Sequence, residues 1–253
     1  MDTARIAELL EPYLGPANDQ PLTTSDVERI STYIDILQRW SIRINLTAIR
    51  NPEQIVTRHF GESLFAARHL FPLRCSAPAV VGPANAACER QPNRGTVDLE
   101  GPRPGADRRG ALAPAVADMG SGAGFPGIPL KLWAPPIHLT LIEANYKKSA
   151  FLREVSRALT LTDINIQTAR AETLKVKFDV ATLRAVERFE SMLPIAARLV
   201  APGGRLGLLI GTAQILRARS ALPMVVWSDP KLIPQSQSRV LLIGMIEQGE
   251  PGQ

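Results

Sequence analysis

The sequence predicts an α/β protein built on a doubly wound, mostly parallel sheet, with a helical cap at its N-terminus. Two observations carry this prediction. From residue 116 onward, short apolar runs alternate with segments of helical periodicity, and glycine-rich turns separate them. Residues 1–74 show helical periodicity only. Strands that alternate with helices are typical of parallel sheets, because each helix returns the chain to the start of the next strand.

We expect three parts in the 253 residues. Residues 1–74 form the helical cap, and residues 116–253 form the α/β domain. Between them, residues 75–115 are rich in Pro, Gly and Arg and show no apolar period, so we interpret them as an insertion or a disordered linker.

The cap is predicted to contain three helices. The first covers residues 2–14. The second runs from about Ser25 to Ile44, because Ser25 and Glu28 match a capping box and apolar residues follow at helical spacing. The third follows the turn at Asn51 and Pro52.

The α/β domain is predicted to begin with a buried strand that ends at Asp118 and is followed by a glycine loop. Asn145 is a typical helix N-cap, because an apolar stripe begins shortly after it. The further predicted strands are residues 137–143, 164–167, 178–182, 205–210, 224–228 and 239–246. The predicted helices lie near residues 127–133, after Asn145 and over residues 187–200.

The net charge is +5, with 29 basic and 24 acidic residues, and it is unevenly distributed. Residues 1–74 carry a net charge of −1, whereas residues 118–199 carry +3 and residues 200–253 carry +2. Most of the cations are Arg, whose planar fork suits phosphate. This charge permits a polyanionic partner without demonstrating one, because a compositional bias of the genome explains it equally well.

Several classes of protein are disfavoured. No apolar run reaches 18 residues, so we expect no membrane-spanning helix. The first residues are acidic and lack a secretory leader, which favours a cytoplasmic protein. Cys75 and Cys88 make no disulfide framework, and neither has a histidine nearby, so we expect no metal site.

The glycine loop after the first predicted strand carries the strongest functional signal. Its sequence from Asp118 to Gly127 is DMGSGAGFPG. Glycines after a strand allow a sharp turn and a close approach to a nucleoside, because no Cβ intrudes. Glu143, at the end of the next predicted strand, is placed to accept hydrogen bonds from a ribose.

The spacing favours S-adenosylmethionine over a dinucleotide. Dinucleotide sites place a pyrophosphate on a helix N-terminus and space their glycines more widely than this G-x-G-x-G pattern. The charges of S-adenosylmethionine are a sulfonium, an ammonium and a carboxylate, which an acid at Asp118 suits better. In the alternative interpretation, Asp118 only orders the loop by accepting hydrogen bonds from its amides.

Motifs along the chain identify a family resemblance. They are Asn45–Arg50 (NLTAIR), Arg58–Leu64 (RHFGESL), Asp118–Pro129 with its GSGAGFPGIP string, Lys147-Lys148, Phe151–Arg153, Arg170–Glu172, Arg184–Val186 and Pro202–Gly204. With these motifs the chain resembles the bacterial small-subunit (16S) rRNA guanine-N7 methyltransferases, also called glucose-inhibited division protein B. The resemblance implies a class I, Rossmann-like S-adenosylmethionine-dependent methyltransferase domain over residues 116–253. Its implied partner is small-subunit rRNA or the 30S particle.

The resemblance also implies roles for individual residues. Arg184 would face the donor methyl group or the incoming base as a positioning residue. The residues expected at the cofactor are Asp118, Gly120, Gly122, Phe125, Glu143, Ala171, Glu172 and Arg184. Candidate RNA contacts are Arg50, Arg58, Lys147, Lys148 and Arg188. Guanine N7 has an exposed lone pair, so no general base is expected, and His59 is a candidate for docking the cap or the RNA rather than for proton transfer.

The chain departs from the family pattern at three places. Residues 75–115 replace a short connection, Leu183 replaces a small hydroxyl residue, and Ile210-Gly211 replaces a lysine-glycine pair. The last two bear on substrate contacts, which leaves a non-catalytic, cofactor-binding ribosomal module as one alternative. An NAD-dependent oxidoreductase is the other.

Overall fold

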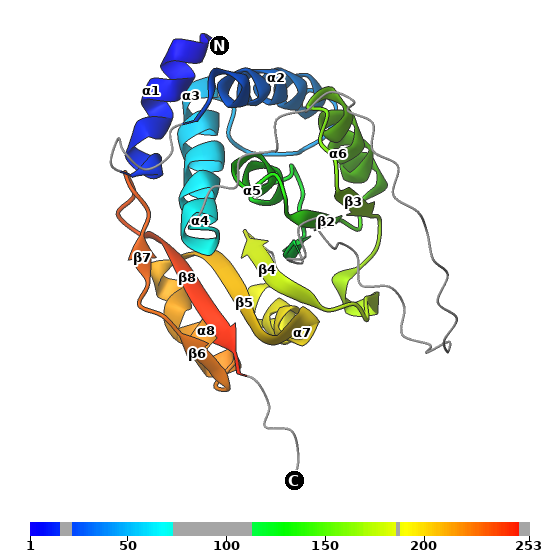
Figure 1. Ribbon diagram of the computed structural model, residues 1–253, viewed down its shortest axis with the longest axis vertical. Helices are drawn as coiled ribbons and strands as arrows, with labels where there is room; N and C mark the ends of the chain where they lie inside the picture. The colour runs from blue at the N-terminus through cyan, green and yellow to red at the C-terminus, as the bar shows by residue number, and fades with distance from the viewer. Residues whose placement is uncertain (16–21, 73–112, 186–187, 248–253) are drawn as a thin grey trace, which may run out of the picture.

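A mixed eight-stranded sheet forms the centre of the computed structural model, which describes residues 1–15, 22–72, 113–185 and 188–247 (Figure 1). The strands follow the order β3-β2-β1-β4-β5-β8-β6, and β7 pairs with β8 outside this path. Their bounds are β1 Ala115–Met119, β2 His138–Ile142, β3 Ile164–Gln167, β4 Phe178–Arg184, β5 Val200–Gly211, β6 Val225–Trp227, β7 Lys231–Leu232 and β8 Arg239–Ile246.

The first five strands are parallel, and β8 runs antiparallel to both β5 and β6. From β1 the order proceeds through β2 to β3 on one side, and through β4 to β5 on the other. The chain direction therefore switches between β1 and β4, where open α/β sheets bind their ligands at the carboxyl ends of the strands. The predicted doubly wound, mostly parallel sheet is confirmed.

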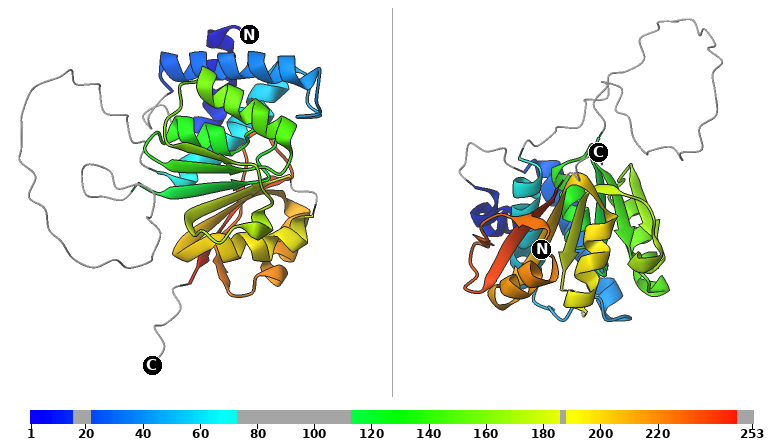
Figure 2. Two further views of the ribbon diagram at one scale, coloured as in Figure 1. Left: turned by 90° about the vertical axis from the view of Figure 1, so that its right-hand side faces the viewer. Right: turned by 90° about the horizontal axis from the view of Figure 1, so that it is seen from below.

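Helices cover both faces of the sheet, as the left-hand view of Figure 2 shows. The N-terminal helices, α5 and α6 share one hydrophobic core on the first face, and α7 and α8 pack on the second. In chain order the helical segments are α1 Thr3–Leu14, α2 Thr24–Ser41, α3 Pro52–Gln54, η1 Ile55–Gly61, α4 Glu62–Leu70, α5 Gly127–Trp133, α6 Tyr146–Ala158, η2 Ala171–Thr173, α7 Phe189–Leu199, η3 Thr212–Gln214 and α8 Ile215–Ala221.

The N-terminal helices are not packed among themselves alone. Ile34 of α2 and Leu64 of α4 belong to the same buried cluster as Leu132 of α5 and Phe151 of α6. A smaller cluster joins Phe65 of α4 to apolar residues of β5 and β8. The helices of the cap therefore pack on the same face of the sheet as α5 and α6, and they extend this layer to β5 and β8.

Most predicted elements are confirmed, including the cap of α6, where the Asn145 side chain accepts hydrogen bonds from the N–H groups of Lys147 and Lys148. The third cap helix is confirmed with a difference, since its first half, η1, is a π-helix. The helix α8 and the strand β7 are short and were not predicted. Residues 75–112 of the predicted insertion lie outside the described residues.

The predicted capping box of α2 is wrong by two residues. The N-cap is Thr23, whose Oγ1 accepts a hydrogen bond from the Asp26 N–H (3.2 Å), and Asp26 Oδ2 accepts one from the Thr23 N–H (2.9 Å). Thr23 and Ser25 each have an acid three residues later, so the sequence offers two overlapping boxes.

None of the helices in the described residues has the length and apolar character needed to span a bilayer. In the same residues, no cluster of three or more His, Cys, Asp or Glu side chains is arranged to hold a metal ion.

The identity of the N-cap residue of α2 can be tested by mutation. We expect Thr23→Ala to lower the free energy of unfolding by about 1 kcal/mol, because the Asp26 N–H in the first turn loses its side-chain acceptor. Ser25→Ala, the control, should change it by less than about 0.5 kcal/mol. Urea unfolding measures the stability of both variants. An equal loss of stability in the two would contradict Thr23 as the N-cap residue.

Candidate active site

Three polar side chains lie on one face of the sheet at the carboxyl ends of β1 and β4. Successive strand residues point to opposite faces. Ala117 and Leu183 point into the core beneath α7, whereas Asp118, Thr182 and Arg184 point toward the face that the cap covers. These polar groups are all buried, so each needs a partner.

The glycine loop leaves the end of β1 and folds over this edge. The N–H groups of Gly120 and Ser121 both donate to the carbonyl of Ile142, at 2.9 and 3.1 Å. Gly122 has a φ of +54°, and a Cβ at this position would meet nothing closer than a carbonyl oxygen at 3.7 Å. The surface beside Gly122 is therefore open to a ligand, whereas a Cβ at Gly124 would collide with the hydroxyl of Tyr33.

Glu143 follows β2 and is joined to the loop. Its Oε2 accepts a hydrogen bond from the Gly122 N–H (2.9 Å), and its Oε1 accepts one from the Asn145 N–H (2.8 Å). A carboxylate offers about four lone-pair positions, so each oxygen can accept a second hydrogen bond. The residues present therefore fit a nucleoside, with an acid held beside an open glycine surface.

Asp118 is fully buried and is used by the loop itself. Oδ2 accepts a hydrogen bond from the Gly127 N–H (3.1 Å), and Oδ1 accepts one from Thr182 Oγ1 (3.0 Å). Burial raises the pKa of this carboxyl to about 6, against the opposing effect of these hydrogen bonds. This placement favours the alternative interpretation, in which the residue orders the loop, and the role of Asp118 at the cofactor stays a prediction.

An aromatic stack joins the loop to the cap. The ring of Phe125 lies between Tyr33, at 5.2 Å and nearly parallel, and His59, at 4.8 Å and 16° from parallel. The Tyr33 hydroxyl donates to the carbonyl of Ala123. Phe125 is thus buried between α2 and η1, and it holds the loop against the cap.

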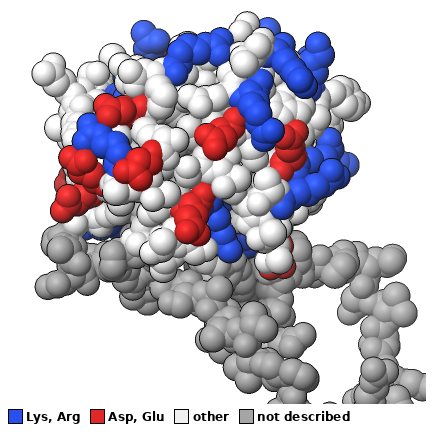
Figure 3. Space-filling view, turned by 90° about the horizontal axis from the view of Figure 1, so that it is seen from above, with Lys and Arg blue, Asp and Glu red and all other residues white. Residues whose placement is uncertain are grey.

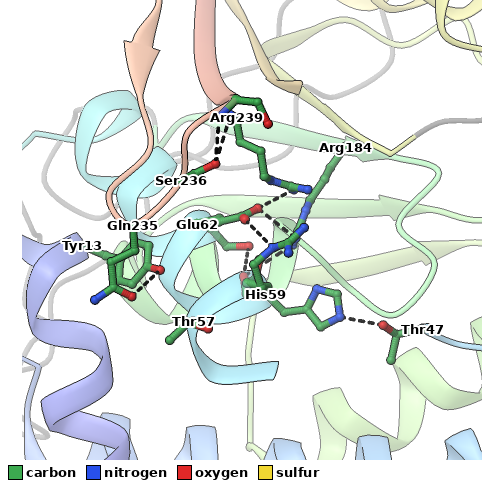
Figure 4. A network of polar contacts seen from close by, with 12 residues as sticks. Tyr13, Thr47, Thr57, His59, Glu62, Arg184, Gln235, Ser236 and Arg239 are labelled. Atoms are coloured by element: carbon green, nitrogen blue, oxygen red, sulfur yellow. Dashed lines mark hydrogen bonds and ion pairs between the residues drawn. The ribbon is translucent and has the colours of Figure 1, made fainter. Parts of the chain in front are cut away.

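At the same edge of the sheet, the buried carboxylate of Glu62 forms ion pairs with three arginines (Figure 4). Glu62, the first residue of α4, is 1% exposed. Its Oε2 lies 3.0 Å from Arg184 Nη2 and 2.6 Å from Arg239 Nη2, and its Oε1 lies 3.1 Å from Arg58 Nε. Arg184 also donates to the carbonyls of Arg58 and His59. The ion cluster therefore ties the cap to β4 and β8.

His59 and His69 are not placed to act as bases. Burial and the nearby charges of Arg184, Arg239 and Arg58 lower the pKa of His59 to about 3, so the ring is neutral near pH 7. Its Nε2 lies 2.7 Å from Thr47 Oγ1. His69 is tied to the carbonyl of Phe65 within α4 (2.8 Å), and burial lowers its pKa as well.

The other predicted residues lie around this edge or at the surface. Ala171 is buried in η2, whereas Glu172 is exposed and its carbonyl accepts a hydrogen bond from Arg198 of α7 (3.0 Å). Among the candidate RNA contacts, Lys148 is half-buried. The exposed ones are Arg50, Arg58, Lys147 and Arg188.

Three side chains that shape the site were not predicted. Tyr33 lies in an apolar helical stripe, which indicates only a core position. Glu62 lies within a family motif, but an acidic residue on a helix is normally expected to be exposed to solvent. Arg239 opens a distant strand. Each acts through a partner far along the chain, so local sequence carries no signal for it.

The ion cluster makes a prediction about stability. We expect Glu62→Ala to lower the free energy of unfolding by about 3–5 kcal/mol, because Arg184 and Arg239 would be left without their carboxylate. Arg58→Ala is the control. Its side chain is 47% exposed, and losing such a pair costs less than about 1 kcal/mol. Denaturant unfolding compares the two, and a Glu62→Ala cost as small as that of the control would show that the cluster is dispensable.

The carboxyl of Asp118 should couple stability to pH. Its folded pKa of about 6 exceeds the ordinary 3.8, so between these values the folded state binds more protons than the unfolded state. This contribution to stability therefore grows as pH falls from about 6 to about 4 and is lost as pH rises. His59, whose folded pKa is lowered, acts in the opposite sense below about pH 6.5.

Asp118→Asn isolates this contribution, because that of His59 cancels when the variant is compared with the wild type. We expect the stability advantage of the wild type to increase as pH is lowered from 7 toward 4. Urea unfolding at several pH values in this range measures it. A difference that does not change with pH would mean that the Asp118 pKa is not raised.

Comparisons with known proteins agree with this geometry. A family model described as rRNA small subunit methyltransferase G matches residues 107–220. The protein named ribosomal RNA small subunit methyltransferase G of Roseiflexus castenholzii is 32% identical over 235 residues, which are 88% of this chain and 84% of the relative. The protein of the same name from Chloroflexus aggregans is 32% identical over 236 residues, covering 88% and 83%. The chain belongs to the rRNA small subunit methyltransferase G family.

Proposed function

We propose that this protein transfers a methyl group from S-adenosylmethionine to N7 of a guanine in small-subunit (16S) rRNA. The observation that carries the proposal is the pairing of Glu143 with the open backbone of Gly122 at the switch point of the sheet. Membership of the family adds the substrate class, because its members are named for the RNA of the small ribosomal subunit.

The residues that would hold the cofactor are those of the loop and the neighbouring strand ends. Glu143 would accept hydrogen bonds from the ribose hydroxyls, and Gly120 and Gly122 would leave room for the nucleoside. Ala171 and Glu172, after β3, would flank the adenine. When bound, the cofactor supplies an electrophilic methyl group carried on a sulfonium.

The protein's part in the reaction is to bind and orient the reactants. Guanine N7 already has a lone pair, so no proton has to be removed before it attacks. Orientation alone can supply roughly 7–11 kcal/mol in ideal cases. A neutral His59, stacked on Phe125, agrees with this requirement. Arg184 is proposed as a positioning residue, because its guanidinium holds η1 and α4 beside the loop.

The departure at Leu183 does not weaken this proposal. Leu183 is buried in the core on the α7 side of the sheet, opposite the face that carries Arg184. A change at this position alters packing rather than a side chain at the site.

We also propose that the protein works in the cytoplasm, on rRNA or on the 30S particle.

The direct test uses small subunits from cells that lack this gene. They are incubated with the protein and with S-adenosylmethionine labelled in its methyl group. We expect label in the rRNA, at a guanine that becomes a cleavage site after borohydride and aniline treatment. Subunits from cells that retain the gene are the control, and naked rRNA in parallel separates the two forms of substrate.

The same assay decides between the alternatives. If S-adenosylhomocysteine binds but no label enters either form of rRNA, the protein is a non-catalytic module. Calorimetric titration with NAD and with S-adenosylhomocysteine tests the third alternative. An oxidoreductase binds NAD, whereas the methyltransferase and the non-catalytic module bind S-adenosylhomocysteine.

The role of Glu143 can be tested by binding. We expect Glu143→Gln to weaken S-adenosylhomocysteine binding about 10- to 100-fold, because hydrogen bonds to a charged acceptor contribute about 1.5–3 kcal/mol. Glu190→Gln removes the charge of an exposed acid on α7, which pairs with Arg217. This control should leave the affinity unchanged. Isothermal titration measures both, and equal affinities in the two variants would remove Glu143 from the cofactor site.

A further inference from the structure

A pocket of about 240 Å³ lies where the C-terminal end of α2 meets the segment that leads to η1. Its walls are aliphatic and polar in equal number: Gln38, Ser41, Ile42, Ile49, Arg50 and Ile55. The volume is below the roughly 300–1,000 Å³ of pockets for drug-sized ligands. The pocket is therefore too small for a whole nucleoside cofactor and suits a single ring system.

Ser41 also lines the pocket. The residue is 8% exposed, and among the described residues its Oγ is buried without a hydrogen-bond partner. Because this oxygen is closed to a water-sized group, it makes no contact with a ligand. The polar group that the pocket offers to a ligand is therefore the guanidinium of Arg50, which is exposed.

Arg50 supplies the charge at the pocket. Its Nη1 donates to the carbonyl of Ser41 (2.9 Å), which fixes the guanidinium and leaves most of its N–H donors unused. Ile42, which is 86% exposed, forms an apolar wall beside it. Two further arginines near the end of α2, Arg39 and Arg43, are exposed. Figure 3 shows Lys and Arg gathered along the upper and right-hand edges of the face that α2 helps to form.

The pocket is connected to the glycine loop by direct contacts. Thr47, between Ile42 and Ile49, lies 2.7 Å from His59 Nε2. The His59 ring in turn stacks on Phe125 of the loop, at 4.8 Å. Ile55, a wall of the pocket, is also the first residue of η1, which carries His59. A ligand in the pocket would therefore lie at the same edge of the molecule as the proposed reaction.

We propose that this pocket binds one unpaired nucleobase of the rRNA substrate, at a position other than the methylated guanine. This inference rests on the proposed function. Proteins recognise RNA sequence mainly on unstacked bases, which they hydrogen-bond on their edges and stack on arginine planes or side-chain surfaces. The fork of Arg50 contacts the base edge, Ile42 and Ile49 contact its faces, and the exposed arginines attract the flanking phosphates.

Arg50→Lys separates base recognition from attraction to phosphate. Lysine keeps the charge and can still donate to the Ser41 carbonyl, but it lacks the planar fork. With small subunits as substrate we expect a KM about tenfold higher, the order of loss for one base contact. The control is Arg43→Ala, which removes an exposed charge that does not line the pocket and should have a smaller effect that fades as salt increases. If lysine restores a wild-type KM, Arg50 contacts phosphate and the proposed base contact is wrong.

Cross-linking identifies the occupant directly. A photoreactive benzoylphenylalanine replaces Ile42 in the full chain, and a control carries it at Leu216, an exposed apolar residue of α8. After irradiation with small subunits, position 42 should cross-link to one unpaired nucleotide, and position 216 should not. A cross-link from position 42 to a base-paired nucleotide, to a ribosomal protein or to nothing at all overturns the proposal.

The failure of this proposal can be told from failure of the proposed function. If the wild type transfers label to rRNA while Arg50→Lys keeps a wild-type KM, only the pocket assignment is wrong. If the wild type transfers no label, the proposed function fails first.

Discussion

The burial of the Glu62 carboxylate is the constraint on which the rest of the structure depends. A carboxylate removed from water needs compensating charge close by, and here Arg184 and Arg239 supply it from the ends of β4 and β8. These partners are 122 and 177 residues away along the chain. Because a buried charge is costly without its partner, these pairs hold α4 against the ends of β4 and β8, at the edge of the sheet that carries the glycine loop.

The same placement of the cap determines the shape of the glycine loop. With η1 and α2 fixed, His59 and Tyr33 enclose the ring of Phe125, and the Tyr33 hydroxyl holds the loop carbonyl at Ala123. Burial, together with the arginines around Glu62, lowers the pKa of His59 and keeps the ring neutral near pH 7. Structure and chemistry are thus consistent, because an uncharged, stacked imidazole orients a loop without acting as a base, and guanine N7 requires none.

The fold could be read from the sequence because its signals are local. The strand pattern, the glycines after β1 and the cap at Asn145 each depend on neighbouring residues, and the structure confirms them. The prediction of the α2 N-cap is wrong by two residues because Thr23 and Ser25 each have an acid three residues later, as a capping box requires. The ion cluster could not be predicted, since it joins residues from three distant segments. The motif places Asp118 at the end of a strand, but it does not tell whether the carboxylate serves the loop or the cofactor.

The alternation of side chains along the strands explains two departures from the family pattern, at Leu183 and at Ile210. Thr182 and Arg184 lie on the face that the cap covers, while Leu183 between them is enclosed by apolar residues on the α7 side. A side chain at position 183 therefore reaches the site only through the packing of β4. Ile210, the other substitution, is likewise buried in the core on the α7 side. Both apolar residues stabilise the strands that present Arg184, so their departures from the pattern are compatible with methyl transfer.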